Sequence, residues 1–215
     1  MEIVNASIER YLNELAAVDD EPVLLEMERL AADEGFPIIG RLCGRYLEML
    51  ARSIGARRIF EMGSGYGYSA YWFSRATGPA GEIHLTDGDP ANERRALDFL
   101  GRAGLDGPIR YRVGDAFDGL AEVEGEFDVV YVDIDKHDYL KAWEAGKRRV
   151  RVGGYYVCDN MLWSGRVTGE AEGKDERPHW TEAIVATNRA IAADPNFRET
   201  INPTRDGVVA ALRIA

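Results

Sequence analysis

Carboxylate and amide side chains directly follow two apolar stretches in the second half of the chain. Asp133 follows residues 127–132, and Asp159 and Asn160 follow residues 155–158. If these stretches are neighbouring strands of a parallel sheet, their carboxyl ends share the edge where ligands bind, so the three side chains can converge. Such oxygen donors suit Mg²⁺, Ca²⁺ or Mn²⁺ better than Zn²⁺. The same residues also allow a helix cap at Asp133 and a plain turn at Asp159-Asn160.

Lys136 lies three residues after Asp133. One helical turn would bring its ammonium group to the same place. A lysine whose pKa is lowered by burial or by a neighbouring cation can act as a general base. Most lysines are simply solvated, so the spacing nominates Lys136 for this role without establishing it.

A glycine-rich turn occurs earlier in the chain. Residues 61–69 read Glu-Met-Gly-Ser-Gly-Tyr-Gly-Tyr-Ser, between an apolar stretch and a helical run. Glycines let the backbone approach a ligand closely, and Asp87, at the end of the next apolar stretch, is placed to accept hydrogen bonds from a ribose. Tyr68 stands where the dinucleotide fingerprint has its third glycine, which favours an adenine nucleoside over a diphosphate. Without a ligand, the turn is a tight strand-to-helix connection.

Composition limits the classes of protein that remain. The 215 residues are 46% hydrophobic, enough for a core, and carry a formal net charge of −11, which argues against binding nucleic acid. Cys43 and Cys158 lie far apart and indicate neither a disulfide framework nor a zinc site. No apolar run is long enough to span a membrane, and residues 1–4 lack the basic start of a signal peptide. We therefore expect a cytoplasmic protein with no membrane partner.

The elements that position these side chains follow from the spacing of apolar residues. Residues 1–55 have helical spacing and predict three helices, the second starting after a cap at Asp20 and ending at Gly35. Beyond them, short β-type runs alternate with helical stretches, which predicts βαβ units. We expect a single domain, 1–215, made of N-terminal helices (1–55) and an α/β core (56–215). The expected strands are residues 58–62, 82–86, 109–113, 127–132, 155–158, 196–201 and 208–214.

The connections predict how the strands pair. The first five strands are joined by segments long enough for crossover helices and should pair in parallel. The last two are joined only by residues 202–207 and should form an antiparallel hairpin at the sheet edge. Residues 162–178 are the one long irregular stretch, and a loop of that length is often a functional lid.

Several of these motifs resemble a known enzyme superfamily. The run Glu61-x-Gly63-x-Gly65, with Asp87 one strand later, is similar to the first motif and the ribose acid of the S-adenosylmethionine (SAM)-dependent methyltransferases. The residues Gly114-Asp115-Ala116 are similar to that superfamily's adenine-side turn. An ordinary helix cap at Asp115 explains the same residues equally well.

A second set of motifs makes the resemblance specific. Asp133-x-Asp135-Lys136, together with the run from Asp159 to Val167, resembles the cation-dependent O-methyltransferases of the catechol and caffeoyl-CoA type. The resemblance implies an α/β fold with a Rossmann-like seven-stranded sheet, mostly parallel with an antiparallel C-terminal strand, and helices on both faces. It also implies that the protein is often a homodimer. Residues 168–178 match no pattern of the family, which leaves the methyl acceptor open.

The resemblance assigns roles to individual residues. It places a divalent cation, Mg²⁺ or otherwise Ca²⁺ or Mn²⁺, on Asp133, Asp159 and Asn160, and gives catalysis to Lys136 together with Asp133. The ribose acid is often Glu in the family and is the shorter Asp87 here, a difference of little consequence. The positions that match cofactor-binding residues are Ile39, Glu61, Gly63, Ser64, Ser69, Asp87, Asp115, Ala116 and Asp135.

The expected reaction is methyl transfer from SAM to a hydroxyl of a vicinal dihydroxy aromatic such as a catechol or a caffeoyl-like compound. The cation would chelate both oxygens and Lys136 would remove a proton. Trp163 is a candidate wall for this phenolic acceptor, with plain core packing as the alternative, and the adjoining Ser164 is a further candidate contact.

Three other functions remain open from the sequence. A related methyltransferase could act on a hydroxylated tRNA base of the 5-hydroxyuridine type, although the basic clusters that RNA would need are short. An NAD-dependent dehydrogenase is disfavoured by the missing third glycine and leaves Asp159-Asn160 unexplained. A module that senses the cofactor without catalysis would not need both the lysine and the proposed ligand set.

Overall fold

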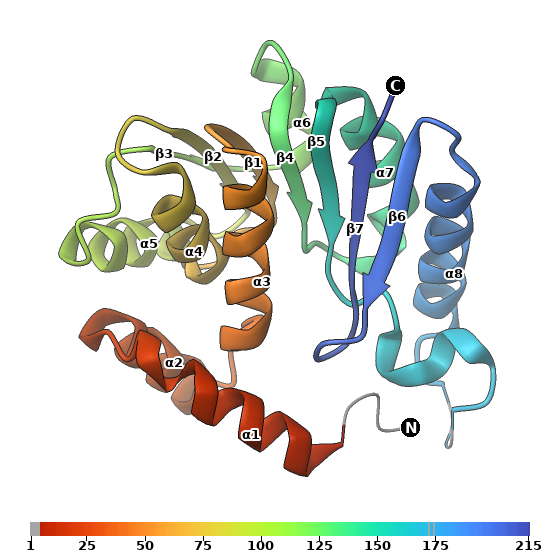
Figure 1. Ribbon diagram of the computed structural model, residues 1–215, viewed down its shortest axis with the longest axis horizontal. Coiled ribbons are helices and arrows are strands. Elements are labelled where there is room, and N and C mark those ends of the chain that lie inside the picture. Colours follow the sequence, from red (N-terminus) through yellow and green to blue (C-terminus); the bar gives the residue numbers. More distant parts are fainter. Residues whose placement is uncertain (1–4, 172, 174) are drawn as a thin grey trace.

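The structure is a computed structural model, and it describes residues 5–171, 173 and 175–215. These residues form one seven-stranded sheet with helices on both faces (Figure 1). All seven expected strands are present, and the expected fold class is confirmed. The strands are β1 (Arg58–Met62), β2 (Glu82–Asp87), β3 (Ile109–Val113), β4 (Phe127–Val132), β5 (Val150–Cys158), β6 (Phe197–Asn202) and β7 (Val208–Arg213).

The sheet has the strand order β3-β2-β1-β4-β5-β7-β6. The first five strands pair in parallel and β7 runs antiparallel to β6, as the connections predict. Strand β7 also pairs antiparallel with β5. The strand order reverses between β1 and β4, and a parallel sheet opens a crevice at the carboxyl ends of the strands beside such a switch point. The topology therefore puts the glycine-rich turn after β1 next to the carboxylates after β4.

Strand β5 begins five residues earlier than the sequence predicts. Residues 153–154 are both glycine, a pair that favours a break, but they form a bulge within the strand. The register shifts there, since Val150 pairs with Phe127 while Tyr155 pairs with Val129. A Cβ atom on Gly154 would lie 2.6 Å from the carbonyl oxygen of Asp128, so the bulge depends on the absence of a side chain.

Eight α-helices surround the sheet in the described part of the chain. The three expected N-terminal helices are present, and Gly35 ends the second in the left-handed conformation with φ 64°. The expected cap at Asp20 is wrong. Glu21 precedes the helix without a capping side chain, because the Asp20 carboxylate pairs with Arg41 instead. The helices are α1 (Ala6–Ala16), α2 (Pro22–Glu34), α3 (Gly40–Ser53), α4 (Tyr68–Thr77), α5 (Pro90–Arg102), α6 (Ala116–Glu122), α7 (Tyr139–Gly146) and α8 (Pro178–Ala193).

Short 3-10 turns connect several of these elements: η1 (Ala17–Asp19), η2 (Lys136–Asp138), η3 (Lys147–Arg149) and η4 (Trp163–Thr168). The stretch 162–178, predicted to be irregular, contains η4 and then leads into α8. Residues 172 and 174 of that stretch, and residues 1–4, lie outside the described residues. None of the described helices is both long and apolar enough for a membrane-spanning segment.

Two hydrophobic cores lie on opposite faces of the sheet, because successive strand residues point to opposite sides. In β1, Ile59 belongs to the core covered by α2, α3, α4 and α5, whereas Phe60 belongs to the core covered by α6, α7 and α8. The alternation repeats in β4, where Val129 and Val130 separate in the same way. The central strands β1 and β4 are therefore buried on both faces, and their carboxyl ends are held between two packed helical layers.

Helices α3 and α4 make a close contact within the first core. A Cβ atom on Gly44 of α3 would lie 2.2 Å from the indole nitrogen of Trp72 on α4, and Trp72 is fully buried. Gly101, near the end of α5, has no such neighbour, because a Cβ atom there would meet only an Asp106 oxygen at 4.0 Å. A side chain at Gly44 would therefore collide with Trp72, whereas a side chain at Gly101 would have room.

The pair gives a test of packing between α3 and α4. We expect Gly44→Ala to lower the free energy of unfolding by about 1–3 kcal/mol, since Trp72 must move out of a filled core. Gly101→Ala should raise it by up to about 1 kcal/mol through the lower conformational entropy of the unfolded chain. Urea unfolding followed by circular dichroism measures both. Equal effects of the two substitutions would contradict the assigned contact.

Candidate active site

A cavity of about 810 Å³ lies at the carboxyl edge of the sheet. It is bounded by the turn after β1, the ends of β2 and β4, and the segment between α2 and α3. Of the residues predicted for the site, most line this cavity: Ile39, Gly63, Ser64, Ser69, Asp87, Asp115, Ala116, Asp133, Asp135, Lys136, Asn160 and Trp163. Glu61, Asp159 and Ser164 do not line it.

The glycine-rich turn after β1 is locked to both neighbouring strands. The backbone amides of Gly63 and Ser64 both donate to the carbonyl of Thr86 on β2, at 3.2 and 2.9 Å. Gly63 has a φ of 81°, and a Cβ atom on it would lie 2.1 Å from the carbonyl oxygen of Asp133. The turn therefore requires glycine both for its conformation and for its approach to the end of β4. The result is a rigid backbone floor for the cavity.

Glu61 is a fully buried carboxylate beneath this floor. Ser69, which lines the cavity from α4, donates its hydroxyl hydrogen bond to Oε1 of Glu61, whereas Oε2 is buried and has no partner among the described residues. Burial, together with the charges of Asp133 and Asp87, raises the pKa of Glu61 to about 8, against the favourable hydrogen bond from Ser69. An unpaired buried oxygen is costly unless a ligand supplies a donor.

Asp87 closes the cavity at the end of β2. Its Oδ2 accepts from the backbone amide of Gly65 at 3.0 Å, and its Oδ1 accepts from the Asp89 amide and from Asn92 Nδ2. Each carboxylate oxygen has more than one acceptor site, so Asp87 is held in place with capacity left toward the cavity. This arrangement fits the expected contact with a ribose.

Asp115 begins α6 on the other side of the cavity. Its Oδ1 accepts from the backbone amides of Phe117 and Asp118, at 2.8 and 3.0 Å. The helix-cap explanation is therefore confirmed for this residue. Asp115 and Ala116 also line the cavity, so the cap brings the start of α6 to the place where an adenine is expected.

Lys136 reaches the cavity from η2, one turn after β4. Its Nζ donates to Asp133 Oδ1 at 3.0 Å and to the carbonyl oxygen of Ile134 at 3.1 Å. The ammonium nitrogen also lies 4.9 Å from the centre of the buried Tyr139 ring. The predicted proximity of Lys136 to Asp133 is confirmed, and the short η2 turn is what produces it.

Asp159 is placed differently from the expectation. Its side chain is fully buried behind the cavity, and its Oδ2 accepts from Nη1 of Arg205 at 2.8 Å. Burial and the charge of Asp133 raise the pKa of Asp159 to about 7, and the guanidinium of Arg205 opposes this rise. Arg205 lines the cavity whereas Asp159 does not. The guanidinium therefore stands between this carboxylate and the space that a ligand would enter.

The three predicted cation ligands do not form an open site. The Asp133 carboxylate accepts from Lys136, the Asp159 carboxylate accepts from Arg205, and the Asn160 amide nitrogen lies 3.5 Å from an Asp206 oxygen. Asp159 Oδ1, like Oε2 of Glu61, is buried and has no partner among the described residues. Oxygen donors of the right kind are present, yet two cationic side chains already occupy the carboxylates. As arranged, these residues do not fit a resident divalent cation.

Two tryptophans form one wall of the cavity. Trp163 lies in η4 and Trp180 lies near the start of α8, with ring centroids 5.7 Å apart, and both line the cavity. Trp163 is thus beside the ligand space rather than only in the core. Ser164 is not: its backbone amide donates to Asp206, and its side chain does not border the cavity. The expectation of a contact between Ser164 and the acceptor is therefore not supported by this placement.

Arg205 is the site residue that the sequence did not reveal. It lies in the turn between β6 and β7, which the spacing predicts only as a hairpin connection. Its only sequence signal is a single cationic residue before Asp206-Gly207, and a basic residue in a turn is normally solvated. The contact with Asp159 spans 46 positions of the chain, and only the insertion of β7 beside β5 brings the two together.

The cavity, the turn and the topology can be compared with known proteins. The sequence profile described as O-methyltransferase matches residues 14–214. A catechol O-methyltransferase from Niastella koreensis is 31% identical over 195 residues, which is 87% of this chain and 88% of that protein. Caffeoyl-CoA O-methyltransferase 2 from Populus trichocarpa is 28% identical, over 95% of this chain and 87% of its own length.

Solved structures have the same fold. The O-methyltransferase TomG from Streptomyces achromogenes, involved in tomaymycin synthesis and solved in complex with SAM, superimposes with a TM-score of 0.82 at 25% identity, covering 97% of this chain and 96% of that one. A methyltransferase from Geobacter sulfurreducens gives a TM-score of 0.84 at 25% identity, covering 100% and 99%. With the family profile spanning nearly the whole chain, these similarities lead to one conclusion: the protein belongs to the O-methyltransferase family.

Proposed function

We propose that the protein transfers the methyl group of SAM to one hydroxyl of a vicinal dihydroxy aromatic small molecule. The observation that carries this proposal is a single cavity that joins the glycine-rich turn and Asp87 at one end to Lys136 and Trp163 at the other. A cavity of this size takes a nucleoside cofactor together with a small acceptor. The names of the related catechol and caffeoyl-CoA enzymes support this acceptor class.

The cofactor end of the cavity fits a molecule with a cationic amino acid part and a nucleoside part. Glu61 does not border the cavity itself, but it lies behind Ser69 and has a buried oxygen without a partner among the described residues. An ammonium group is a donor that such a carboxylate lacks. Asp87 has remaining acceptor capacity for ribose hydroxyls. The backbone of Gly63 leaves room because it has no side chain. These three features match the proposed roles of the residues toward SAM.

The chain's own residues have few tasks in such a reaction. SAM, when bound, supplies an electrophilic methyl group on a sulfonium. Lys136 in its amine form takes the proton of the acceptor hydroxyl at Nζ, and the oxygen lone pair forms the new O–C bond as the S–C bond breaks toward sulfur. Trp163 and Trp180 hold the aromatic ring and keep water away, so that the reacting atoms stay aligned.

The expected divalent cation is left out of this proposal. Asp133 and Asp159 each accept from a cationic side chain, and Asp159 does not border the cavity. The reaction as proposed needs only deprotonation and alignment of the acceptor, and both follow from residues that do line the cavity. The Arg205–Asp159 ion pair therefore raises the question whether an arginine takes the place of a metal ion in this protein.

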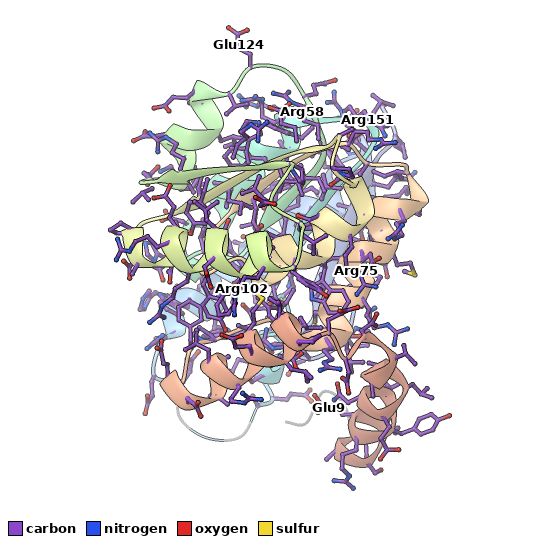
Figure 2. The ribbon with its side chains drawn as sticks, turned by 90° about the vertical axis from the view of Figure 1, so that its left-hand side faces the viewer. Glu9, Arg58, Arg75, Arg102, Glu124 and Arg151 are labelled. Atoms are coloured by element: carbon purple, nitrogen blue, oxygen red, sulfur yellow. The ribbon has the colours of Figure 1, made fainter. Side chains whose placement is uncertain are left out.

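A small molecule is favoured over tRNA as the acceptor. The basic clusters that RNA would need are partly neutralised, since Arg58, Arg95 and Lys147 form ion pairs with the acids Glu82, Glu34 and Asp194. Arg58 begins β1, at the amino end of the sheet. Figure 2 shows it at the opposite end of the molecule from Glu9 of α1. None of these three basic residues lines the cavity.

We further propose that the protein is a homodimer that pairs through α1. The apolar side chains on this helix follow helical spacing and form one exposed face: Ile8, Tyr11, Leu12 and Leu15. Ala16 is the only buried residue of α1. Such a face costs free energy in water unless another surface covers it, and a second copy of the same helix is a matched cover.

Lys136 gives the most direct test of the mechanism. We expect Lys136→Ala to lower kcat for a catechol acceptor by about 100-fold or more, because general-base assistance is lost, with little change in the affinity for SAM. Lys147→Ala is the matched control, since Lys147 pairs with Glu144 and Asp194 away from the cavity and should leave kcat unchanged. Steady-state kinetics and calorimetry with SAM separate the two effects. An unchanged pH–rate profile in Lys136→Ala would remove Lys136 from the role of base.

Glu61 gives a test through pH. Its pKa of about 8 lies above its ordinary value of 4.5, so its contribution to stability is complete below pH 4.5 and is lost as the pH rises through 8. Glu61→Gln should therefore raise the free energy of unfolding at pH 7.5 by about 1–3 kcal/mol and flatten its pH dependence between pH 5 and 8. The same substitution should weaken SAM binding at least tenfold. Urea unfolding at several pH values and calorimetry measure the two effects.

Glu48→Gln is the control for this test. Glu48 is also a buried carboxylate, but it pairs with Arg52 and Arg75, so its substitution should lower stability rather than raise it. If both Gln variants destabilise the protein to the same extent, Glu61 is not held at an energetic cost for a ligand.

The proposed dimer is tested by Leu15→Glu. A charge in the apolar face should convert the dimer to a monomer of 23.9 kDa, measured by light scattering after size exclusion. Val152→Glu is the control, because Val152 is 55% exposed on β5, outside α1, and should leave the mass unchanged. A wild-type protein that is monomeric at all concentrations would overturn the proposal.

A further inference from the structure

Arg205 adopts a backbone conformation that is unfavourable for its residue type. Its φ is 54°, in the left-handed region. A residue with a Cβ atom pays on the order of 1–2 kcal/mol there, whereas glycine pays nothing comparable. Its neighbour Gly207 also has positive φ and is the residue type that such turns prefer. A strained arginine within this turn points to a role for its side chain.

That side chain is directed to a buried carboxylate. Nη1 of Arg205 lies 2.8 Å from Oδ2 of Asp159, whose side chain is fully buried. Arg205 remains partly accessible and lines the cavity together with Asp133, Lys136 and Asn160. Within the described residues, Asp159 is the only hydrogen-bond partner of the Arg205 guanidinium. The N–H groups on Nε and Nη2 therefore remain for a group inside the cavity.

Each carboxylate of this cluster already has a cationic partner. Two carboxylates, Asp133 and Asp159, are paired with two cationic side chains, Lys136 and Arg205. Two carboxylates that lie close together in a buried place require positive charge nearby, and Lys136 and Arg205 supply it here. To reach these two carboxylates, a divalent ion would have to compete with the cationic side chains that are already paired with them. It would also have to displace a guanidinium from an ion pair.

We propose that the Arg205 guanidinium is the resident cation of this site, and that the protein methylates its acceptor without a divalent metal. The inference rests on the proposed function for its chemistry. A guanidinium presents parallel N–H groups in a fixed fork, which matches two neighbouring oxygens of a dihydroxy aromatic. It therefore holds the oxygen that loses its proton to Lys136 and stabilises the negative charge that develops there.

The rival arrangement is a metal site that Arg205 vacates. In that case Asp133, Asp159 and Asn160 would bind the metal ion after the guanidinium moves away. Arg205 would then pair with Asp159 only while no metal ion is bound. The two arrangements differ in how the wild-type protein responds to a metal ion. They differ also in the metal binding and the activity expected once the guanidinium is removed.

The first experiment uses the full-length wild-type protein, treated with chelator and checked for residual metal. Mn²⁺ is the probe, because its binding is read by electron paramagnetic resonance without any need for turnover. We expect no stoichiometric Mn²⁺ binding, and catechol methylation with the same kcat in excess EDTA as in Mg²⁺. One bound Mn²⁺ per chain, or activity lost in EDTA and restored by Mg²⁺, would overturn the inference.

The second experiment compares Arg205→Gly with Arg205→Lys. The glycine variant relieves the strained backbone and leaves Asp159 without its cation, so it should gain one Mn²⁺ site and lose at least tenfold in kcat in EDTA. Added Mg²⁺ or Mn²⁺ should restore part of that loss. The lysine variant keeps a positive charge without the planar fork, and should bind no Mn²⁺. Circular dichroism melting confirms that both variants are folded.

The outcomes separate the two proposals. If Arg205→Gly keeps the full wild-type kcat in EDTA, or fails to gain Mn²⁺ binding, Arg205 does not occupy the place of a cation and the inference is wrong. If no catechol is methylated under any metal condition, the proposed acceptor is wrong. The Mn²⁺ measurements still decide the question about Arg205 in that case.

Discussion

The desolvation of acidic side chains at the carboxyl edge of the sheet is the constraint on which the rest of the site depends. Glu61 and Asp159 are fully buried, and Asp133 stands beside them at the end of β4. Removing carboxylates from water is expensive unless hydrogen bonds or cations compensate. Ser69, Lys136 and Arg205 provide that compensation from three different elements: α4, η2 and the β6–β7 turn. The site is therefore a set of partly compensated acids, in which one oxygen of Glu61 and one of Asp159 have no partner among the described residues.

Much of the fold could be predicted, because the information is local. Strand identity follows from short apolar runs, and the parallel or antiparallel pairing follows from the length of each connection. Where local signals mislead, a distant contact decides. The glycine pair at 153–154 looks like a break, yet β4 accommodates it as a bulge. Asp20 looks like a cap, yet its carboxylate is taken by Arg41 on another helix. No spacing rule contains either contact.

The candidate site divides in the same way. The places of the glycine-rich turn, Asp87 and Lys136 in one cavity are predictable, because each stands at a fixed offset from a strand end. The switch between β1 and β4 brings those ends together. The relation between Asp159 and the cavity was not predictable. Whether that carboxylate faces a ligand or an arginine depends on Arg205, which arrives with the last hairpin. The motifs predict that Asp133, Asp159 and Asn160 follow strands β4 and β5. They do not contain Arg205, whose side chain pairs with Asp159.

The position of β7 also bears on how the protein is made. Strand β7 lies between β5 and β6 and pairs with β5 through residues 155–158 and 209–212. During translation, β5 leaves the ribosome with one edge open, and Asp159 must wait 46 codons for the arginine that neutralises it. The incomplete chain thus holds an unpaired strand edge beside an acid that lacks its cationic partner, and open strand edges are prone to aggregation. The pair of Asp159 and Arg205 can form only after the final hairpin has been made.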